Sequence, residues 1–325
     1  MGHISTPNKK NLIIVSGRAH PKLAEDVATQ LGSEVLASEN RTFANGEIYA
    51  RYGESVRGCD AFVIQAHSYP INEWLMEQLI MVDALKRASA KRITVVAPFY
   101  PYARQDKKGR GREPISARLV ADMFKAAGAD RIMSVDLHAA QIQGFFDGPV
   151  DHLFSMPVLL EHFREKLNID ELTIVSPDMG RVRVADIWSD KLGAPLAIIH
   201  KRRDPQVPNQ VSVHEIVGDV EGRVCLLVDD LIDTGRTIQK AAEALKNAGA
   251  KSVVVAATHA VFSDPATEVL QSEAIDEVVV TDTLPLPDSK KWDRLTILPI
   301  APLLARAIRE VFDDGSVTSM FDGQA

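Results

Sequence analysis

Short apolar runs rich in β-branched residues alternate with amphipathic helical patterns along the whole chain. The runs are LIIVSG, AFVIQ, ITVVAP and RIMSVD in the first half, and TIVSPD, LAIIH, RVCLLVD, SVVVAAT, EVVVTDT and LTILPIA in the second. Nearly continuous apolar strands between amphipathic helices are typical of parallel sheets that are covered on both faces. The pattern therefore predicts an α/β fold with doubly wound, mostly parallel sheets.

An internal repeat indicates two related halves. Residues 84–97 (ALKRASAKRITVVA) and 244–257 (ALKNAGAKSVVVAA) are identical at eight of fourteen positions, with a constant offset of 160. Chance similarity between two helix–turn–strand units could supply a few matches, but an offset near half of the chain favours duplication. Because 325 residues suffice for two domains that each bury a core, we expect similar domains at 1–155 and 156–325.

Composition is that of an ordinary globular protein, with 46% apolar and 25% charged residues. No apolar run approaches the roughly 18 residues of a membrane span, and the polar start lacks a signal-peptide pattern, so we expect a cytoplasmic protein. Cys59 and Cys225 lie in apolar, strand-like contexts, which favours core positions over a disulfide. The net charge of −7 argues against nonspecific binding to nucleic acid.

The cations are nevertheless concentrated in two segments. Residues 104–118 contain six cations and two acids, and residues 200–204 (HKRRD) contain three adjacent cations. A single charged run is most often a solvated loop. Two basic loops at strand ends of an acidic protein favour a small polyanionic ligand, because ligands of doubly wound sheets bind beyond the carboxyl ends of the strands.

The stretch VCLLVDDLIDTGRTIQKAAEAL (224–245) places three carboxylates directly before a small-residue turn and a helix. Backbone N–H groups and hydroxyls at a helix start bind phosphate, and Gly235 allows close approach of the backbone. The carboxylates can accept hydrogen bonds from a diol, so a sugar phosphate satisfies both features. The candidate residues are Asp229, Asp230, Asp233, Thr234, Gly235, Arg236 and Thr237.

Two motifs of unrelated folds overlap this stretch. DDLID matches the DDxxD motif of isoprenoid diphosphate synthases, which are all-helical, and DTG matches the triplet of aspartic proteases, which are β-rich and need a second triplet. Helix capping accounts for Asp233 but leaves Asp229 and Asp230 unexplained. The chain contains no GxxxxGK[ST] motif, which excludes an ordinary P-loop kinase.

Several segments together resemble a known family. VDDLIDTGRT (228–237) is similar to the phosphoribosyl-pyrophosphate fingerprint of type I phosphoribosyltransferases, and SVDLHAAQIQGFFDGPVDHL (134–153) resembles the signature of ribose-phosphate pyrophosphokinases. FANGE, PYARQDKKGRGREPISAR, SPDMGR and HKRRD also resemble segments of that family, in order along nearly the whole chain. The resemblance implies two phosphoribosyltransferase-like domains, with ATP and metal bound mainly by the first and ribose 5-phosphate by the second.

The resemblance also implies a reaction and a cofactor. The enzyme would transfer the diphosphoryl group of ATP to the anomeric hydroxyl of ribose 5-phosphate, releasing AMP and supplying nucleotide, histidine and tryptophan biosynthesis. It assigns His138 and Asp178 to Mg²⁺, with Asp136 close by. Mg²⁺ prefers oxygen and keeps several waters, so a site of few protein ligands completed by ATP phosphates is reasonable. Without the resemblance, His138 is more often a capping or core histidine.

In the same way the basic loops acquire roles. Arg104, Gln105 and Asp106 resemble the RQD segment that binds ATP in the family. Lys201 and Arg203 match its KRR segment, where they would neutralise charge during transfer, and Arg203 would also contact ribose 5-phosphate. Phosphoryl-type transfer depends mainly on positioning and electrostatic stabilisation.

FANGE (43–47) resembles an ATP-contacting segment that reaches a neighbouring subunit in the family. Phe43 would stack on adenine, Glu47 would accept a hydrogen bond, and Asn45 and Gly46 would complete the contact. A plain Asn-Gly turn explains the same residues. Asn45 departs from the usual aspartate of the family.

A second departure lies in the phosphate turn, where Arg236 replaces a glycine. It adds a donor fork for phosphate but strains the turn if that position needs positive φ.

Two alternatives stay open, a non-catalytic regulatory homologue and a true phosphoribosyltransferase. Retention of His138, Asp178, Lys201 and Arg203 favours activity, and phosphoribosyltransferases lack the DLH segment and the duplicated first half. The resemblance further implies a hexamer, inhibition by ADP and activation by phosphate, with no nucleic-acid or membrane partner.

Overall fold

The computed structural model describes residues 11–202 and 213–321. Its contacts divide the chain into two compact units. Unit 1 comprises Met1–Phe154 and Ala301–Ala325, and unit 2 comprises Ser155–Ile300. Each unit has its own sheet and its own buried core.

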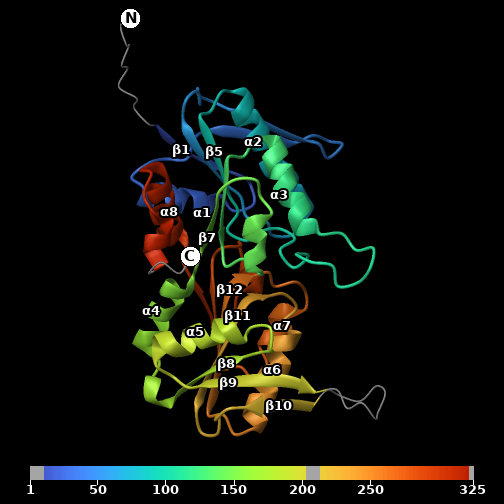
Figure 1. The fold of residues 1–325 in the computed structure, drawn as a ribbon, viewed down its shortest axis with the longest axis vertical. Coiled ribbons are helices and arrows are strands. Elements are labelled where there is room, and N and C mark those ends of the chain that lie inside the picture. Colours follow the sequence, from blue (N-terminus) through green and yellow to red (C-terminus); the bar gives the residue numbers. More distant parts are fainter. Residues whose placement is uncertain (1–10, 203–212, 322–325) are drawn as a thin grey trace, which may run out of the picture. The chain divides into compact units, whose positions relative to one another are not determined.

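Unit 1 contains a five-stranded parallel sheet in the order β1-β4-β5-β6-β7 (Figure 1). Apolar side chains of α2 and α3, such as Val82 and Phe124, pack on strand residues Val63 and Val95, all 0% exposed. The elements are β1 (Leu12–Ser16), α1 (Pro21–Gln30), β4 (Asp60–Ile64), α2 (Ile71–Arg87), β5 (Arg92–Val96), α3 (Ser116–Ala127), β6 (Arg131–Val135), η1 (Ala140–Gly144), β7 (Val150–Leu153), α8 (Ala301–Phe312) and η4 (Val317–Phe321).

A separate antiparallel hairpin projects from unit 1. Strands β2 (Ser38–Thr42) and β3 (Ile48–Tyr52) pair in a two-stranded sheet, with Thr42 opposite Ile48. The FANGE segment forms its tip, and Gly46 there has a φ of 91°. The predicted Asn-Gly turn is therefore present at the end of an exposed hairpin.

Unit 2 contains a seven-stranded sheet in the order β10-β9-β8-β11-β12-β13-β14, in which only the β9–β10 pairing is antiparallel among the described strands. In the central strand, Cys225 and Leu227 pack into one core, and Leu226 and Val228 into the core on the other face. The elements are α4 (Met156–Lys166), η2 (Ile169–Glu171), β8 (Leu172–Ser176), α5 (Val182–Leu192), β9 (Leu196–Arg202), β10 (Val213–Val217), β11 (Val224–Ile232), α6 (Arg236–Asn247), β12 (Ser252–Ala260), α7 (Ala266–Leu270), β13 (Glu277–Thr281), η3 (Asp288–Lys290) and β14 (Leu295–Leu298).

Strands β1-β4-β5-β6-β7 of the first sheet follow the same order as β8-β11-β12-β13-β14 of the second, which adds β9 and β10 at one edge. Strand β4 lies between β1 and β5, as β11 lies between β8 and β12. Helix α2 connects β4 to β5, as α6 connects β11 to β12. The repeated segments 84–97 and 244–257 both span the end of the connecting helix and the strand that follows. The predicted α/β class, with two similar and mostly parallel sheets, is confirmed.

The C-terminal helix differs from the predicted domain division. Residues 301–325 were assigned to the second domain but belong to unit 1. The apolar face of α8 is buried, with Leu304 and Ile308 at 0% exposure, and the helix packs along α1 (Figure 1). Arg309 donates to the carbonyl of Leu31 at 3.0 Å. The chain therefore returns to complete the first unit, where α8 adds to the burial of α1, which also contacts β1.

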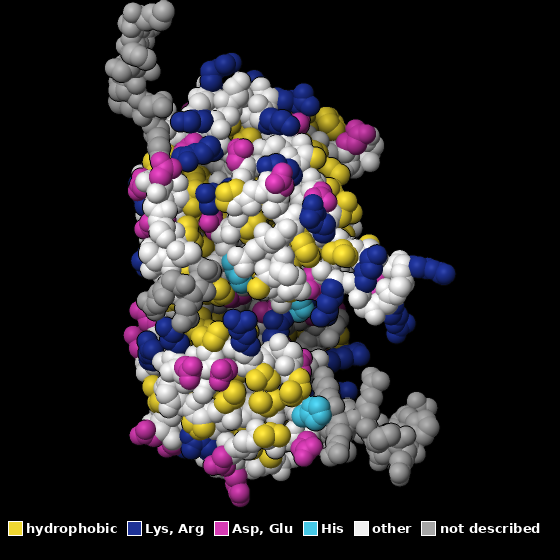
Figure 2. All heavy atoms as spheres, in the orientation of Figure 1, with side chains coloured by type: hydrophobic (Ala, Val, Ile, Leu, Met, Phe, Trp, Pro, Cys, Tyr) yellow, Lys and Arg dark blue, Asp and Glu magenta, His cyan; other side chains and the backbone are white. Residues whose placement is uncertain are grey.

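The surface mixes charges of both signs. Figure 2 shows Lys and Arg side chains interspersed with Asp and Glu side chains over the visible face of each unit. Cys59 and Cys225 are both buried and free, as predicted. Across residues 11–202 and 213–321, no helix combines the length and the apolar character needed to cross a membrane.

Candidate functional site

The turn between β11 and α6 leaves a helix start open. Gly235 adopts the left-handed backbone conformation, with φ 74°, directly before Arg236, the first residue of α6. A Cβ at Gly235 would lie 3.1 Å from Leu270 Cγ, so packing and backbone both favour glycine here. The unpaired N–H groups of a helix start and the helix dipole attract an anion. The turn therefore has the geometry of a phosphate cradle.

The remaining residues of the turn surround this helix start. Asp233 and Thr234 are half-buried, and Thr237 is exposed in the first turn of α6. Arg236 is also exposed, and it is helical. The expectation that Arg236 strains the turn is wrong, because Gly235 supplies the positive φ one residue earlier.

The two carboxylates at the end of β11 share one arginine. Arg181, the residue before α5, places Nη2 2.6 Å from Asp230 Oδ1 and Nε 3.3 Å from Asp229 Oδ1. The side chains of Arg181, Asp229 and Asp230 are only 14%, 17% and 9% exposed. Burial raises the pKa of Asp229, the negative charge of Asp230 raises it further, and Arg181 opposes both effects. Arg181 therefore offsets part of the electrostatic repulsion between Asp229 and Asp230. The two carboxylates could also accept hydrogen bonds from a sugar diol.

The SPDMGR segment follows β8 in the same unit. Asp178 is half-exposed, and its Oδ1 accepts a hydrogen bond from the N–H of Gly180 at 2.8 Å. The hydroxyl of Ser176 donates to the carbonyl of Asp178 at 2.7 Å. These local bonds hold the backbone and one carboxylate oxygen of Asp178 at the strand end.

The HKRRD segment is only partly described. Lys201 lies in β9, opposite His214 of β10. Arg203 lies outside the described residues, as do the following residues up to 212. The proposed role of the two cations therefore stays a prediction.

In unit 1, Asp136 and His138 follow β6. Asp136 has a φ of 40°, a conformation that costs free energy in a non-glycine residue and is frequent at functional sites. Its N–H donates to the carbonyl of Leu153 at 2.8 Å, and the N–H of Leu137 donates to His152 Nε2 at 2.9 Å. Both candidate ligands are half-buried. The neighbouring strand β7 thus holds the DLH segment in this strained shape.

These residues fit a magnesium ion whose shell the substrate completes. Among the described residues, no group of three His, Cys, Asp or Glu side chains could hold a metal by itself. Mg²⁺ is usually bound by one or two carboxylates together with water and substrate phosphates. The carboxylate of Asp136 could supply such an oxygen, and the imidazole of His138 lies two residues further along the chain. The donor set is too small for a closed structural metal site.

The basic segment after β5 is organised around Gln105 and Asp106. The carbonyl of Gln105 accepts from the N–H of Ala117 at 3.2 Å, and its side chain accepts from Ser116 Oγ at 2.7 Å. Asp106 is 7% exposed and accepts a hydrogen bond from Gln141 Nε2. Arg104 and Gln105 are exposed. Asp106 therefore links the segment to η1, whereas its two neighbours face solvent, where a ligand can reach them.

The hairpin tip presents the FANGE residues to solvent. Residues 41–47 are all exposed, and Phe43 is 44% exposed. The side chain of Asn45 accepts from the N–H of Glu47 at 3.2 Å, and the N–H of Phe43 donates to the carbonyl of Glu47 at 2.7 Å. Asn45 thus shapes the turn as an aspartate would, without its charge.

Sequence reasoning missed two residues of these sites. Arg181 lies in the SPDMGR segment, where only Asp178 was predicted to bind a ligand, and Gln141 was not predicted at all. An arginine after a strand that neighbours the acid-bearing strand is a signal that could have indicated Arg181, since the carboxyl ends of parallel strands meet at one edge. Gln141 offers no comparable signal, because its partner Asp106 is 35 residues away on another loop.

Comparisons with known proteins place these features in a family context. A model of the N-terminal domain of ribose phosphate pyrophosphokinase matches residues 12–128, and a phosphoribosyl synthetase-associated domain matches residues 204–322. A curated ribose-phosphate pyrophosphokinase of Streptomyces coelicolor is 63% identical, over 100% of both chains. One of Corynebacterium glutamicum is 61% identical, over 98% of both chains. A crystal structure of phosphoribosylpyrophosphate synthetase from Mycobacterium smegmatis matches with a TM-score of 0.89 and 59% identity, covering 94% of this chain and 100% of that one.

Proposed function

We propose that this chain, which belongs to the ribose-phosphate pyrophosphokinase family, converts ATP and ribose 5-phosphate to 5-phosphoribosyl 1-pyrophosphate and AMP. The observation that best supports the proposal is the β11–α6 turn, which combines an anion-binding helix start with two carboxylates that are only 17% and 9% exposed. The 5-phosphate of the sugar would occupy the first, and its ring hydroxyls would reach the second.

Each residue of the turn has a role in sugar binding. The N–H groups and hydroxyls of 234–237 would bind the 5-phosphate, with the exposed guanidinium of Arg236 as a further donor. Asp229 and Asp230 would accept hydrogen bonds from the sugar diol. Because Arg181 contacts both acids through different nitrogens, it could keep one of these contacts if the diol displaced the other.

The reaction is a displacement at the β-phosphorus of ATP. The anomeric oxygen of the sugar forms a bond to the β-phosphorus and loses its proton, while the bond from that phosphorus to the oxygen bridging the α-phosphate breaks. The leaving oxygen stays with AMP. Because charge accumulates on phosphoryl oxygens, cations placed beside them lower the barrier. Lys201 and Arg203 would supply this charge.

ATP would be bound by exposed groups of unit 1. Arg104 and Gln105 are exposed after β5, as are Phe43, Gly46 and Glu47 at the hairpin tip. Magnesium, when bound, would neutralise the phosphates and orient them. Its protein ligands would be Asp136 and His138, with Asp178 as the candidate ligand beside the sugar. Asp106 would hold the ATP segment in shape through Gln141 rather than contact the nucleotide.

One assay tests the activity. The purified chain is incubated with Mg²⁺, ATP and ribose 5-phosphate, and AMP is followed with and without the sugar. Sugar-dependent AMP release, lost when Mg²⁺ is chelated, supports the proposal. AMP release that does not depend on the sugar would refute it. Complete absence of turnover in a folded protein that still binds the sugar would favour the non-catalytic homologue.

The family context also supports statements about assembly and location. We expect a hexamer, in which the exposed hairpin tip would serve a neighbouring subunit, with ADP as an inhibitor and phosphate as an activator. We also expect a cytoplasmic enzyme. Native mass measurement of the full chain tests the hexamer, and AMP assays with added ADP or phosphate test the two effectors.

A further inference from the structure

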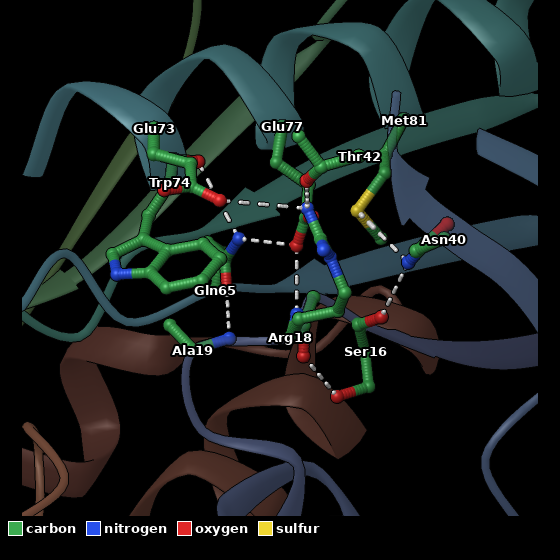
Figure 3. Close-up of polar contacts among 11 residues, drawn as sticks. Ser16, Arg18, Ala19, Asn40, Thr42, Gln65, Glu73, Trp74, Glu77 and Met81 are labelled. Carbon is green, nitrogen blue, oxygen red and sulfur yellow. Dashed lines mark hydrogen bonds and ion pairs between the residues drawn. The ribbon is translucent and has the colours of Figure 1, made fainter. Parts of the chain in front are cut away.

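Arg18, in the turn after β1, is held on several sides (Figure 3). Its backbone N–H donates to Glu77 Oε1 at 2.7 Å, and its Nε donates to Glu77 Oε2. Its Nη2 donates to Thr42 Oγ1 at 3.0 Å and lies 3.8 Å from Glu73 Oε1. The guanidinium carbon lies 5.7 Å from the ring centroid of Trp74. One arginine therefore links the β1–α1 turn, helix α2 and the β2–β3 hairpin.

Glu77 is the fixed end of this link. It is 0% exposed, and its Oε1 also accepts from Gln65 Nε2 at 2.9 Å. Gln65 Oε1 in turn accepts from the N–H of Ala19 at 3.2 Å. A buried carboxylate that loses its cation pays a large desolvation cost, so Glu77 strongly fixes the guanidinium of Arg18. The side chain of Arg18 itself is 30% exposed, which allows its far edge to reach the hairpin.

Thr42 is the movable end. It is the last residue of β2 and directly precedes Phe43. The hairpin has three other described side-chain bonds to the sheet and α2. Asn40 Nδ2 donates to the Ser16 carbonyl (3.3 Å) and to Met81 Sδ (3.8 Å), and Tyr52 Oη donates to the Met81 carbonyl (2.8 Å). All three lie farther from the tip in sequence than Thr42. Among these described bonds, the one from Arg18 is therefore nearest to the tip.

The tip is ordered by its own contacts as well. The guanidinium carbon of Arg41 lies 5.2 Å from the Phe43 ring centroid and 4.8 Å from that of Tyr49. The two rings meet edge to face, with centroids 6.0 Å apart. An isolated two-stranded hairpin is marginally stable in water, so these contacts need an anchor to present Phe43 in a constant place.

We propose that Arg18 is a positioning residue for the nucleotide: fixed by Glu77, it anchors the hairpin through Thr42 so that Phe43 and Glu47 meet ATP in one orientation. This inference rests on the proposed function, which assigns the hairpin tip to ATP. Pre-organisation of a binding group reduces the cost of ordering it on binding. Loss of the anchor therefore weakens ATP binding and leaves sugar binding unchanged.

The sharpest test is Thr42→Val, which removes the acceptor and keeps the buried Arg18–Glu77 pair and the strand preference. Loss of one hydrogen bond should raise the KM for ATP about three- to tenfold, with the KM for ribose 5-phosphate within about twofold of wild type. Amide hydrogen exchange over residues 38–52 should accelerate. Thr29→Val is the matched control, because the Thr29 hydroxyl donates within α1, to the Glu25 carbonyl at 2.8 Å. It should change neither constant.

A second variant removes the arginine without stranding a buried charge. Arg18→Met combined with Glu77→Gln keeps an acceptor for Gln65 and for the N–H of residue 18. It should match Thr42→Val in both readouts, and adding Thr42→Val to it should change neither readout further. Additive effects would overturn the link, because they would mean that the two ends act separately.

The exchange and kinetic readouts also separate two failures. Unchanged exchange over 38–52 in both variants overturns the anchor, whether or not the enzyme is active. Faster exchange with an unchanged KM for ATP overturns the connection to the nucleotide. Equal rises in both Michaelis constants would indicate a general structural defect and overturn it as well. A wild-type protein without AMP release would count against the proposed function alone.

Discussion

The β4–α2 turn of unit 1 and the β11–α6 turn of unit 2 occupy equivalent positions in the two sheets but are built differently. In unit 2 the helix begins after Gly235, with carboxylates on the strand end before it. In unit 1 the strand is followed by buried Gln65 and His67, and α2 begins after Pro70. A Cβ at Gly17 would lie 2.2 Å from Gln65 Oε1, so the Gln65 side chain packs closely against the β1–α1 turn. The polar residues after β4 are therefore used for packing, whereas those after β11 are the ones proposed to bind the sugar phosphate.

The first strand of each unit also ends near an arginine, with a different consequence. Arg18 of unit 1 pairs with Glu77, which is completely buried. Arg181 of unit 2 pairs with Asp229 and Asp230, which are 17% and 9% exposed. Arg18 thus has one carboxylate partner with no exposed surface, although its own side chain is 30% exposed, whereas Arg181 is shared between two acids that both keep some exposed surface. We expect the first arginine to anchor structure and the second to be able to exchange a partner when a ligand binds.

Asp229→Asn gives the largest expected effect. It removes a charged acceptor for the sugar diol, so kcat/KM for ribose 5-phosphate should fall roughly a hundredfold. The same change should stabilise the ligand-free protein at neutral pH, because burial and Asp230 raise the pKa of Asp229. When the pKa of a carboxyl group is higher in the folded than in the unfolded protein, the free energy of unfolding of the protein falls as pH rises from about 4 towards the folded pKa.

Thermal unfolding of wild type and Asp229→Asn between pH 4 and 8 measures this second effect. The stability advantage of the variant should grow with pH. If Asp229→Asn were active but no more stable than wild type at neutral pH, the comparison of a charged β11–α6 turn with a packed β4–α2 turn would be contradicted.

Gly235→Ala should raise the KM for ribose 5-phosphate roughly tenfold. The new Cβ meets a positive φ and the side chain of Leu270, so the turn must shift by a few tenths of an ångström where the phosphate binds. Gly222→Ala is the control, with a φ of 69° and no atom within 4 Å of its Cβ. It lies before β11, at the opposite end of the strand. Equal Michaelis constants for both variants would refute a special role of Gly235.

The buried His67 allows the packing of the β4–α2 turn of unit 1 to be tested through the pH dependence of stability. Burial lowers its pKa to about 4, and its Nδ1–H donates to the Phe99 carbonyl at 3.2 Å. A histidine with a depressed folded pKa contributes stability above its unfolded pKa of about 6.5, and loses it as pH falls towards 4. The full loss amounts to roughly 3 kcal/mol.

Denaturant unfolding of wild type and His67→Gln from pH 7.5 to 4 measures this contribution. The wild type should lose more free energy of unfolding than the variant over that interval. Parallel pH profiles would show that His67 is not held neutral by packing.

Arg236→Gly should have the smallest effect. Glycine at the first helical position loses a donor for phosphate and about 1 kcal/mol of helix preference at most. The KM for ribose 5-phosphate should therefore stay constant or rise up to about threefold, with a slightly lower unfolding temperature. A clearly lower KM would revive the strain that the helical backbone of Arg236 argues against.

Much of this arrangement follows from local sequence. Apolar runs predicted four of the five strands of the first sheet and six of the seven of the second, but not β7, β10 or the hairpin strands β2 and β3. A repeat of fourteen residues indicated that the two sheets are related. The phosphate turn was recognisable because Gly235, the acids and the helix are adjacent in the chain. These features depend on neighbours within about twenty residues, where backbone preference and side-chain chemistry act directly.

The tertiary structure decided the contacts between distant segments. It placed α8 on unit 1, brought Arg181 to the acids of β11, buried Asp106 against Gln141, and set Arg18 between Glu77 and Thr42. Each of these contacts joins residues that are far apart in the chain and meet only after the sheets have formed. The periodicity of the sequence therefore does not predict them. Local sequence therefore determined most of the helices and strands and the candidate phosphate turn. Long-range packing decided the partners of the charged groups, because a buried charge is stable only where the fold supplies its counter-charge.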